Sequence, residues 1–294
     1  MKVFITGVES FVGKELIKIL KKYPKIEVYG CDLNIRKNKF FNKADIRKKN
    51  FYKGIPKNID VIIHLAAISR DQDCSNDLME CYKTNVIGTL NVLEAAKKLN
   101  IKKVLFASTE WVYYNKLAQK GADEDSKLDL NNLKSDYAKS KLISEDHCKS
   151  YFEKFKIDIT ILRFGIIYGE RFKNWSAVEA IFNNVKKTEN ITVGSLKTSR
   201  KFIHISDICY GIIKAIKLKN FNIINLQGEK LITLKEIINN SEKVLNKKIK
   251  IKETSANSPS IRKIYSKKSN QKIKFKPNIS IKEGLLRLNR LFNN

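Results

Sequence analysis

Short apolar runs rich in β-branched residues alternate with longer amphipathic segments through the first half of the chain. The short runs predict strands over residues 2–6, 26–31, 60–66, 103–108 and 158–164. Apolar positions that recur at the helical period predict helices over residues 12–22, 78–99 and 136–155. Strands that alternate with helices are typical of βαβ units, which form a parallel sheet covered by helices. The pattern therefore predicts an α/β fold, a doubly wound parallel sheet.

The rhythm changes after Gly169, where the elements become shorter and their connections more polar. We therefore expect a first domain over residues 1–169 and a smaller C-terminal lobe over residues 170–294. A short strand that runs into a helix lies within residues 200–222, and we expect this segment to pack back on the first domain. No internal repeat or low-complexity tract interrupts the sequence.

The chain is strongly basic, with 58 Lys and Arg residues against 30 Asp and Glu residues among 294. A formal charge of +28 ordinarily points to nucleic acid or an acidic membrane as a partner. The lysines, however, are spread along nearly every predicted helix and turn, with the densest stretch at residues 247–276. We favour a solvated face over a polyanion-binding surface.

The five cysteines are odd in number, widely spaced and form no C-x-x-C pair. This usage suits a reducing compartment. The first residues enter a strand-like run after a single lysine, so we expect no export signal. The longest apolar runs fall short of the roughly 18 residues that a spanning helix needs. These features predict a cytoplasmic protein without a membrane span.

A turn that contains glycines follows the first predicted strand and leads directly into a helix. Gly7 and Gly13 would allow a tight bend and let a pyrophosphate approach the backbone at the helix N-terminus. Ser10 stands at the middle glycine position of such a turn and adds a side chain where close approach is needed. The residues of the turn that we expect at a dinucleotide are Gly7, Ser10, Phe11, Val12 and Gly13.

An acidic residue, Asp32, follows the second predicted strand, 19 residues after Gly13. A carboxylate at this place accepts hydrogen bonds from the adenosine ribose hydroxyls and repels a 2′-phosphate. The combination of strand, turn, helix and carboxylate predicts a dinucleotide site that favours NAD over NADP.

Tyr137 and Lys141 lie four residues apart on a predicted helix and therefore share one face. A nearby ammonium, aided by the positive nicotinamide, would lower the pKa of the phenol and make it a base for a sugar hydroxyl. Thr109, at the end of the fourth predicted core strand, could hydrogen-bond the reacting oxygen. These three residues form a candidate catalytic set.

Taken in order, these residues and several further motifs resemble a known family. The motifs are Thr6-Gly7 to Gly13, Asp32, Asp45-Ile46-Arg47, His64-Leu65-Ala66-Ala67, Asn85 to Thr89, Ser108-Thr109, Tyr137 to Lys141, Leu162 to Arg171 and Arg200 to Asp207. The combination is similar to the extended short-chain dehydrogenase/reductase family, and more narrowly to its NAD-dependent nucleotide-sugar epimerase/dehydratase branch. The resemblance runs nearly end to end.

The resemblance implies a Rossmann domain, bound NAD, a second lobe that binds a nucleotide-diphosphate sugar, and a homodimer formed through a four-helix interface. The cofactor residues that it implies are Asp45 and Ile46 beside the adenine, Leu65, Ala66 and Ala67 along the cofactor, and Asn85 as support. Arg200 and Arg262 match arginines that contact the nucleotide phosphates, where two guanidinium groups would suit a diphosphate.

Departures from the family pattern limit the choice of reaction. The family's 4,6-dehydratases follow the threonine with Asp-Glu, whereas this chain has Glu110 and Trp111, and the indole cannot act as acid or base. Glu110 remains a candidate acid. Ile166 stands where many 4-epimerases carry an asparagine that contacts the nucleotide, which disfavours UDP-glucose and UDP-galactose.

The leading hypothesis is an NAD-dependent nucleotide-sugar 4-epimerase or a closely related oxidoreductase that acts at the sugar C4. A 4-keto-sugar reductase, a 4-dehydrogenase, a 4,6-dehydratase and a non-catalytic RNA-binding relative stay open as alternatives. The three histidines show no metal-ligand spacing, and we expect no bound metal.

Overall fold

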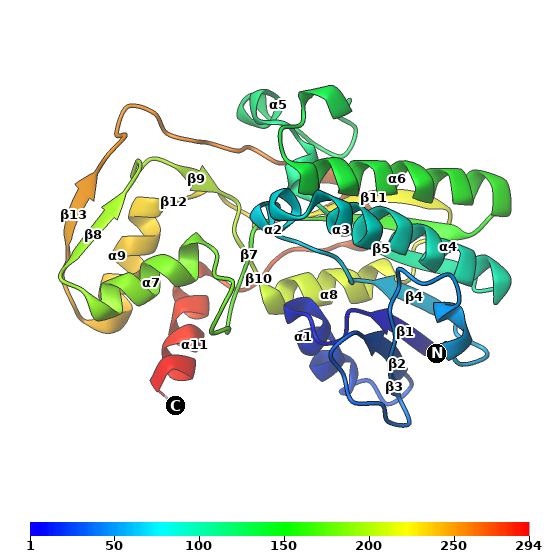
Figure 1. Ribbon diagram of the computed structural model, residues 1–294. Helices are drawn as coiled ribbons and strands as arrows, with labels where there is room; N and C mark the ends of the chain where they lie inside the picture. The colour runs from blue at the N-terminus through cyan, green and yellow to red at the C-terminus, as the bar shows by residue number, and fades with distance from the viewer. Residues whose placement is uncertain (294) are drawn as a thin grey trace.

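The computed structural model describes residues 1–293, and its centre is a seven-stranded parallel sheet with the strand order β11-β6-β5-β4-β1-β2-β3 (Figure 1). The strands are β1 (Lys2–Thr6), β2 (Glu27–Asp32), β3 (Phe41–Lys43), β4 (Val61–His64), β5 (Lys103–Thr109), β6 (Asp158–Phe164) and β11 (Phe221–Leu226). The order reverses between β1 and β4, and a doubly wound sheet opens a ligand crevice at that point. The α/β prediction is confirmed.

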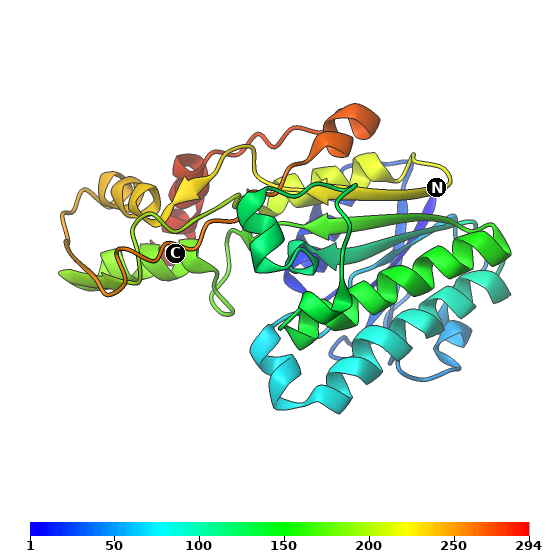
Figure 2. The same cartoon turned by 90° about the horizontal axis from the view of Figure 1, so that it is seen from above.

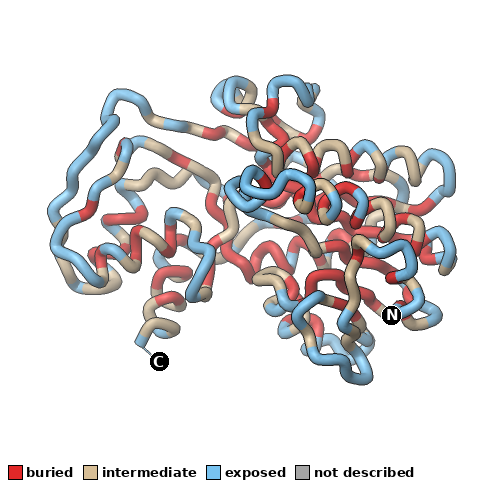
Figure 3. Tube along the Cα trace, viewed as in Figure 1, coloured by how far each residue is buried: buried red, intermediate tan, exposed pale blue. Residues whose placement is uncertain are grey.

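Helices cover both faces of this sheet, as Figure 2 shows from above. One face packs against α1 (Phe11–Leu20), α8 (Ile205–Ala215) and α10 (Lys267–Ile273). The other packs against α4 (Gly88–Lys98) and α6 (Asp136–Phe155), with η1 (Phe51–Gly54) at its margin. The central strands β1, β4, β5 and β6 are buried on both sides, which explains the apolar runs in their sequences (Figure 3).

The five strands predicted from the sequence are confirmed, with ends that either coincide with the prediction or shift by at most two residues. The prediction of one continuous helix over residues 78–99 is wrong. That stretch consists of α3 (Leu78–Tyr82), a π-helical segment η2 (Lys83–Ile87) and α4, and it is preceded by the short α2 (Asp71–Asn76). The π segment adds a residue per turn, which shifts the later side chains around the helix axis.

A separate hydrophobic cluster, formed by the C-terminal half of the chain, lies apart from the sheet at the left of Figure 1. It is formed by α7 (Ala177–Lys187), α9 (Leu234–Leu245) and α11 (Ile281–Asn293), with β8 (Asn190–Val193) paired to β13 (Lys250–Glu253) and β9 (Ser199–Arg200) paired to β12 (Ile232–Thr233). At the junction β7 (Ile167–Tyr168) pairs with β10 (Ile203–His204). We propose that this cluster is the smaller lobe, while α8, β11 and α10 belong with the large sheet.

Shorter elements complete the fold around the carboxyl edge of the sheet. They are η3 (Glu110–Val112), α5 (Asn115–Lys120) and η4 (Leu130–Asn132). Within residues 1–293, no helix combines the length and the hydropathy needed to cross a membrane.

Cys74 and Cys81 form a disulfide between α2 and α3, with their Cα atoms 4.9 Å apart. Sequence spacing did not predict this pair, because two consecutive short helices fold back on each other and bring the side chains together. The other three cysteines are buried free thiols.

Candidate functional site

The turn after β1 is built by close backbone packing that leaves no room for side chains at two glycines. Gly7 has a φ of +81°, and a Cβ at Gly13 would lie 2.3 Å from the Gly7 carbonyl oxygen. The Ser10 hydroxyl accepts a hydrogen bond of 3.0 Å from the Gly13 N–H and caps the N-terminus of α1. The serine side chain is therefore turned toward the helix end.

Asp32 ends β2 beside this turn, and its carboxylate oxygens accept hydrogen bonds from the backbone N–H groups of Glu9 (3.0 Å) and Asn34 (3.1 Å). These bonds hold the carboxylate at the rim of a cavity of about 330 Å³. Its predicted lining residues are Gly7, Ser10, Asp32, Asp45, Ile46, Ala66 and Ala67. An adenosine group fits here, because the carboxylate faces a cavity at the carboxyl edge of the sheet.

The predicted adenine pair, Asp45 and Ile46, contributes differently to this cavity. The Asp45 carboxylate pairs with the Arg47 guanidinium at 2.8 Å, and that guanidinium also binds Glu80. The hydrogen bond from Arg47 holds the pKa of Asp45 below its ordinary value. Ile46 is buried, and its Cδ1 atom lies 2.7 Å from where a Cβ at Gly88 would stand. One wall of the cavity is therefore fixed by an ion-pair cluster and by close packing on α4.

A second cavity of about 320 Å³ shares Ser10 and Ala67 with the first and continues along the carboxyl edge of the sheet. It brings together the three residues of the candidate catalytic set. The predicted residues in its lining are Ser10, Phe11, Val12, Leu65, Ala67, Thr109, Tyr137 and Lys141. The two cavities adjoin at these shared residues, and we refer to them together as the groove; it is lined by residues predicted for the dinucleotide and by the candidate catalytic set.

Tyr137 and Lys141 reach this cavity from the first turns of α6, which begins after Ser135 caps the Ala138 N–H at 3.1 Å. Thr109 ends β5, and its hydroxyl oxygen accepts a hydrogen bond of 3.2 Å from the Trp111 N–H. The Lys141 ammonium donates to the Ala107 carbonyl at 2.8 Å. The Thr109 and Lys141 side chains are thus held by contacts with the backbone, and Tyr137 lines the cavity.

Burial dominates the proton affinities of this set. It raises the pKa of the Tyr137 phenol to about 12, and a hydrogen bond with Thr109 acts in the opposite direction. It lowers the pKa of the Lys141 ammonium to about 8, while the nearby Glu145 carboxylate acts in the opposite direction. The expectation that Lys141 lowers the pKa of Tyr137 is therefore not met by the protein alone, because this ammonium is bound to Ala107.

Glu110 does not line the groove. Its side chain is buried, and Oε1 lies 3.2 Å from Arg262 Nε. Burial raises the pKa of the Glu110 carboxyl, while Arg262 and Arg200 act to lower it. The role of Glu110 as a catalytic acid stays a prediction. In the structure its carboxylate forms an ion pair with Arg262.

The two arginines predicted for phosphate contact lie in this same charge cluster, and both are bound to their own chain. Arg262 donates to Asn115 and to the backbone carbonyls of Glu110 and Tyr113 at 2.7–2.9 Å. Arg200 donates to the Ser260 carbonyl at 2.6 Å and to its hydroxyl at 2.9 Å. A phosphate contact would require either guanidinium to exchange some of these bonds, and it stays a proposal.

Asn85 and His64 support the groove from behind. The Asn85 amide accepts from the Ile68 N–H and donates to the Ile68 carbonyl, both at 2.9 Å. His64 lies between the hydroxyls of Thr6 (2.7 Å) and Thr89 (3.1 Å). Within residues 1–293, no group of three or more His, Cys, Asp or Glu side chains is placed to hold a metal.

Sequence reasoning missed two residues that close the second cavity, Arg171 and Trp175. The Arg171 guanidinium lies 4.6 Å from the centre of the Phe11 ring and is held by the buried Glu179 carboxylate at 2.7 Å. Trp175 donates its indole N–H to the Arg171 carbonyl at 3.0 Å. Arg171 ends the family motif Leu162 to Arg171, and this motif could have indicated a role for it at the site. No spacing rule places Trp175 there.

Comparisons with known proteins agree with this geometry. Residues 3–226 match the NAD dependent epimerase/dehydratase family. An uncharacterised protein of Methanocaldococcus jannaschii is 30% identical over 97% of this chain and 94% of its own. The UDP-glucuronate 4-epimerase of Thermodesulfobacterium geofontis is 28% identical over 96% of this chain and 93% of its own.

A solved structure extends the likeness to the whole fold. The UDP-glucuronic acid 4-epimerase of Bacillus cereus, in complex with UDP-glucuronic acid and NAD, superposes with a TM-score of 0.86 at 25% identity, covering 100% of this chain and 99% of that one. The glycine turn, the Asp32 carboxylate and the groove fit NAD. The chain is therefore an NAD-dependent enzyme of the NAD dependent epimerase/dehydratase family, among the extended short-chain dehydrogenases/reductases.

Proposed function

We propose that this enzyme is a UDP-sugar 4-epimerase that inverts the hydroxyl-bearing C4 of the sugar. The observation that carries the proposal is the groove in which Thr109, Tyr137 and Lys141 meet the dinucleotide turn. NAD, when bound, supplies a reversible hydride acceptor for the sugar carbon. The side chains of the protein must then move one proton and hold the sugar in place.

Tyr137 is the base that removes the C4 hydroxyl proton and the acid that returns it. Its phenol needs help to ionise, because burial raises its pKa, which stays at about 12 although the hydrogen bond with Thr109 acts to lower it. Thr109 supplies part of this help by hydrogen bonding, and Lys141 supplies a positive charge once its ammonium turns from the Ala107 carbonyl toward the groove. Lys141 would then also hold the nicotinamide ribose of a bound NAD.

The side chain after Glu110 disfavours elimination of water. Trp111 is 42% exposed, lines the cavity that contains the candidate catalytic set, and has no proton to exchange at neutral pH. Glu110, the neighbouring carboxylate, is bound to Arg262 outside that lining. Elimination of water needs two acid–base groups besides Tyr137, and the lining of this cavity does not provide them. Inversion at C4 needs only Tyr137.

The substrate class rests on the relatives. The protein of T. geofontis is a UDP-glucuronate 4-epimerase, and the B. cereus structure holds UDP-glucuronic acid together with NAD. We therefore propose UDP-sugars as the substrate class, with UDP-glucuronate as the first compound to test.

We also propose a homodimer through the helices that carry Asn85 and Tyr137. Apolar side chains stand exposed on α3 and the π segment, at Leu78, Met79 and Ile87, with 49%, 66% and 46% of their surface accessible. Pairing this face with that of a second copy would cover them. Light scattering would measure the mass, and a monomer at micromolar concentration would contradict the proposal.

The test of the function is incubation of the purified enzyme with UDP-glucuronate or UDP-glucose, followed by NMR of the sugar product. A 4-epimer formed without net NADH supports the proposal. Stoichiometric NADH would identify a dehydrogenase, and loss of C6 as carbon dioxide would identify a decarboxylase, since a 4-ketone is β to the C5 carboxylate. Either result would replace the epimerase.

The Tyr137→Phe variant tests the assigned base. Loss of the phenol should lower turnover by about 10²- to 10⁴-fold, the usual contribution of one acid–base group, while NAD binding is retained. Tyr210→Phe, an exposed tyrosine on α8, is the matched control and should leave turnover unchanged. Full turnover in Tyr137→Phe would reject the assignment.

A further inference from the structure

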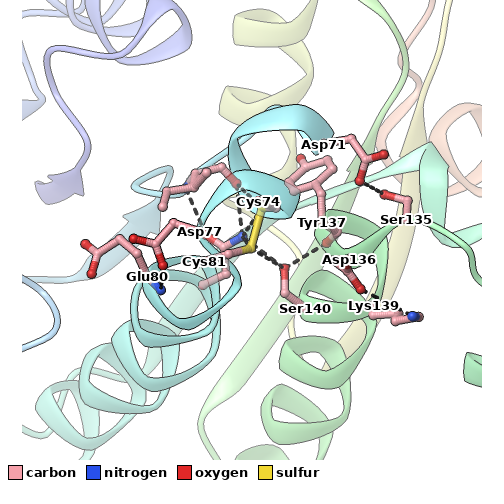
Figure 4. The surroundings of a disulfide bond; sticks show 12 residues. Asp71, Cys74, Asp77, Glu80, Cys81, Ser135, Asp136, Tyr137, Lys139 and Ser140 are labelled. Carbon is pink, nitrogen blue, oxygen red and sulfur yellow. Dashed lines mark hydrogen bonds and ion pairs between the residues drawn. A yellow bond between two sulfur atoms is a disulfide. The ribbon is translucent and has the colours of Figure 1, made fainter.

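The Cys74–Cys81 disulfide lies directly beside the catalytic helix, as Figure 4 shows for Tyr137 and Ser140 of α6. It joins two short helices that contain six and five residues, α2 and α3. Both half-cystines are fully buried. A bond in this place constrains the segment that runs between the cofactor loop at residues 66–68 and the π segment.

A single amide connects the disulfide to the cofactor loop. The Asn85 Nδ2 atom lies 3.5 Å from Cys81 Sγ and 4.0 Å from Cys74 Sγ. The same nitrogen donates to the Ile68 carbonyl and to the Ser140 hydroxyl, each at 2.9 Å. Ile68 lines the adenosine cavity. Asn85 therefore packs against the bonded sulfurs on one side and holds Ile68, a residue of the cavity lining, on the other.

The same contacts reach the base of the reaction. Ser140 precedes Lys141 in α6, and its hydroxyl donates to the Tyr137 carbonyl at 2.8 Å. At the N-terminal end of the helix, Ser135 is bound to Asp71 of α2 at 2.6 Å. Tyr137 thus lies between two contacts that depend on the segment closed by the disulfide.

Reduction would change the hydrogen bonding of this network. Cys74 Sγ lies 3.8 Å from the Ile68 carbonyl oxygen, and Cys81 Sγ lies 3.9 Å from Ser140 Oγ. A disulfide sulfur carries no proton, so Asn85 alone serves these two acceptors. Two thiols would each gain an S–H aimed at the same acceptors and would compete with Asn85. Reduction also releases the chain entropy that the cross-link removes.

We propose that Cys74–Cys81 is a redox modification site at which a dithiol reversibly weakens the binding of NAD. A thiolate of the dithiol attacks one sulfur and breaks the S–S bond, and its second thiol then displaces the mixed disulfide. Two electrons and two protons pass to the cysteines, and the dithiol leaves as a cyclic disulfide. Because both sulfurs are buried, exchange proceeds through local opening of α2, whose other residues are exposed.

A disulfide in a chain of otherwise free thiols fits this role. Three of the five cysteines stay reduced and buried, so the protein is not built on a framework of cross-links. In reducing compartments, disulfides are usually transient and act in catalysis or redox sensing. The bond closes a loop with a sequence separation of only 7, so its effect is local.

The test compares the enzyme after treatment with oxidised glutathione and after treatment with dithiothreitol. Alkylation under denaturing conditions should label three cysteines in the oxidised form and five in the reduced form, as mass spectrometry would show. Calorimetric titration should then give an NAD Kd at least about fivefold weaker for the reduced form, the lower end of typical coupling between sites. Five labelled cysteines after oxidation, or equal Kd values with the labelling verified, would overturn the proposal.

Two variants isolate the pair. The double variant Cys74→Ser, Cys81→Ser should bind NAD like the reduced enzyme and should no longer respond to dithiothreitol. Cys209→Ala, a free thiol on α8, should keep the full response. A dithiothreitol response that persists in the double variant would assign the effect elsewhere. The readout uses no sugar, so a failure here is separate from a failure of the epimerase proposal.

Discussion

The Glu145 carboxylate, one helical turn after Lys141, is held by the Arg163 guanidinium with an Nη2–Oε2 distance of 2.6 Å, and both side chains are about 5% exposed or less. Oε1 of the same carboxylate accepts from the Ser108 hydroxyl at 2.5 Å, and Ser108 precedes Thr109. The pair therefore fixes α6 against the ends of β5 and β6 beside the candidate catalytic set.

Removal of this carboxylate charge should destabilise the protein. Glu145→Gln leaves the Arg163 charge buried and unpaired, which costs about 3–5 kcal/mol. Urea unfolding measures the loss. Glu153→Gln on the same helix is the matched control, because its partner Lys149 lies 3.9 Å away and both side chains are 59% exposed. Equal stability of the two variants would show that the buried pair contributes nothing.

Gly13→Ala should weaken NAD binding by about tenfold or more, or 1.4 kcal/mol of binding free energy. The added methyl would stand 2.3 Å from the Gly7 carbonyl oxygen and push the turn away from the N-terminus of α1. Calorimetric titration with NAD provides the measurement. Gly194→Ala is the control, since a Cβ there meets nothing within 4 Å. Unchanged affinity in Gly13→Ala would contradict the assigned turn.

Asp32→Asn should shift the cofactor preference toward NADP. The substitution removes the charge that repels a 2′-phosphate and keeps one oxygen that can accept from the Glu9 or Asn34 N–H. We expect the ratio of NADP to NAD affinity to rise by about tenfold. Asp60→Asn serves as control, because its carboxylate binds the Lys2 N–H at the opposite end of the sheet. An unchanged ratio would separate Asp32 from cofactor choice.

His64 should make the fold sensitive to acid. Burial, together with the charge of Lys141, lowers the pKa of His64 from 6.5 to about 3, so the folded protein keeps this imidazole neutral. Between pH 6.5 and 3 the unfolded chain binds a proton that the folded chain does not, and stability falls as the pH falls. The slope from this group is about 1.4 kcal/mol per pH unit.

The matched measurement is the unfolding free energy of the wild type and of His64→Gln at pH 7, 6 and 5. The variant lacks the titrating group, so its stability deficit should shrink as the pH falls. Parallel curves for the two proteins would show that folding does not lower the pKa of His64.

The sheet could be predicted from the sequence because its strands are buried on both faces and contain continuous apolar residues. β5 is an example, since all seven of its residues are buried. The π segment after Tyr82 could not be predicted, because its apolar positions also fit the period of an ordinary α-helix. A shift of one residue per turn changes which side chains face the core and leaves no mark in the pattern.

The sequence could place the candidate catalytic residues at one cavity where they lie at fixed spacings on regular elements. Tyr137 and Lys141 are separated by one helical turn, and Thr109 ends a strand. Trp175, in contrast, lies in a loop before α7, where no periodicity relates a residue to the sheet edge. The link between Cys74 and Asn85 depends on how three short helical segments pack, which local spacing does not specify.

The position of β11 at the edge of the sheet has a consequence for synthesis of the chain. β6 pairs with β5 on one side and with β11 on the other, and residues 221–226 leave the ribosome after α7 and β8 of the smaller lobe. Until β11 has been made, the apolar strand β6 has an unpaired edge, and such an edge can pair with the wrong strand. A fragment that stops at residue 169 would keep that edge permanently. The nucleotide-binding half of this enzyme therefore becomes a finished folding unit only after a large part of the C-terminal half has been made.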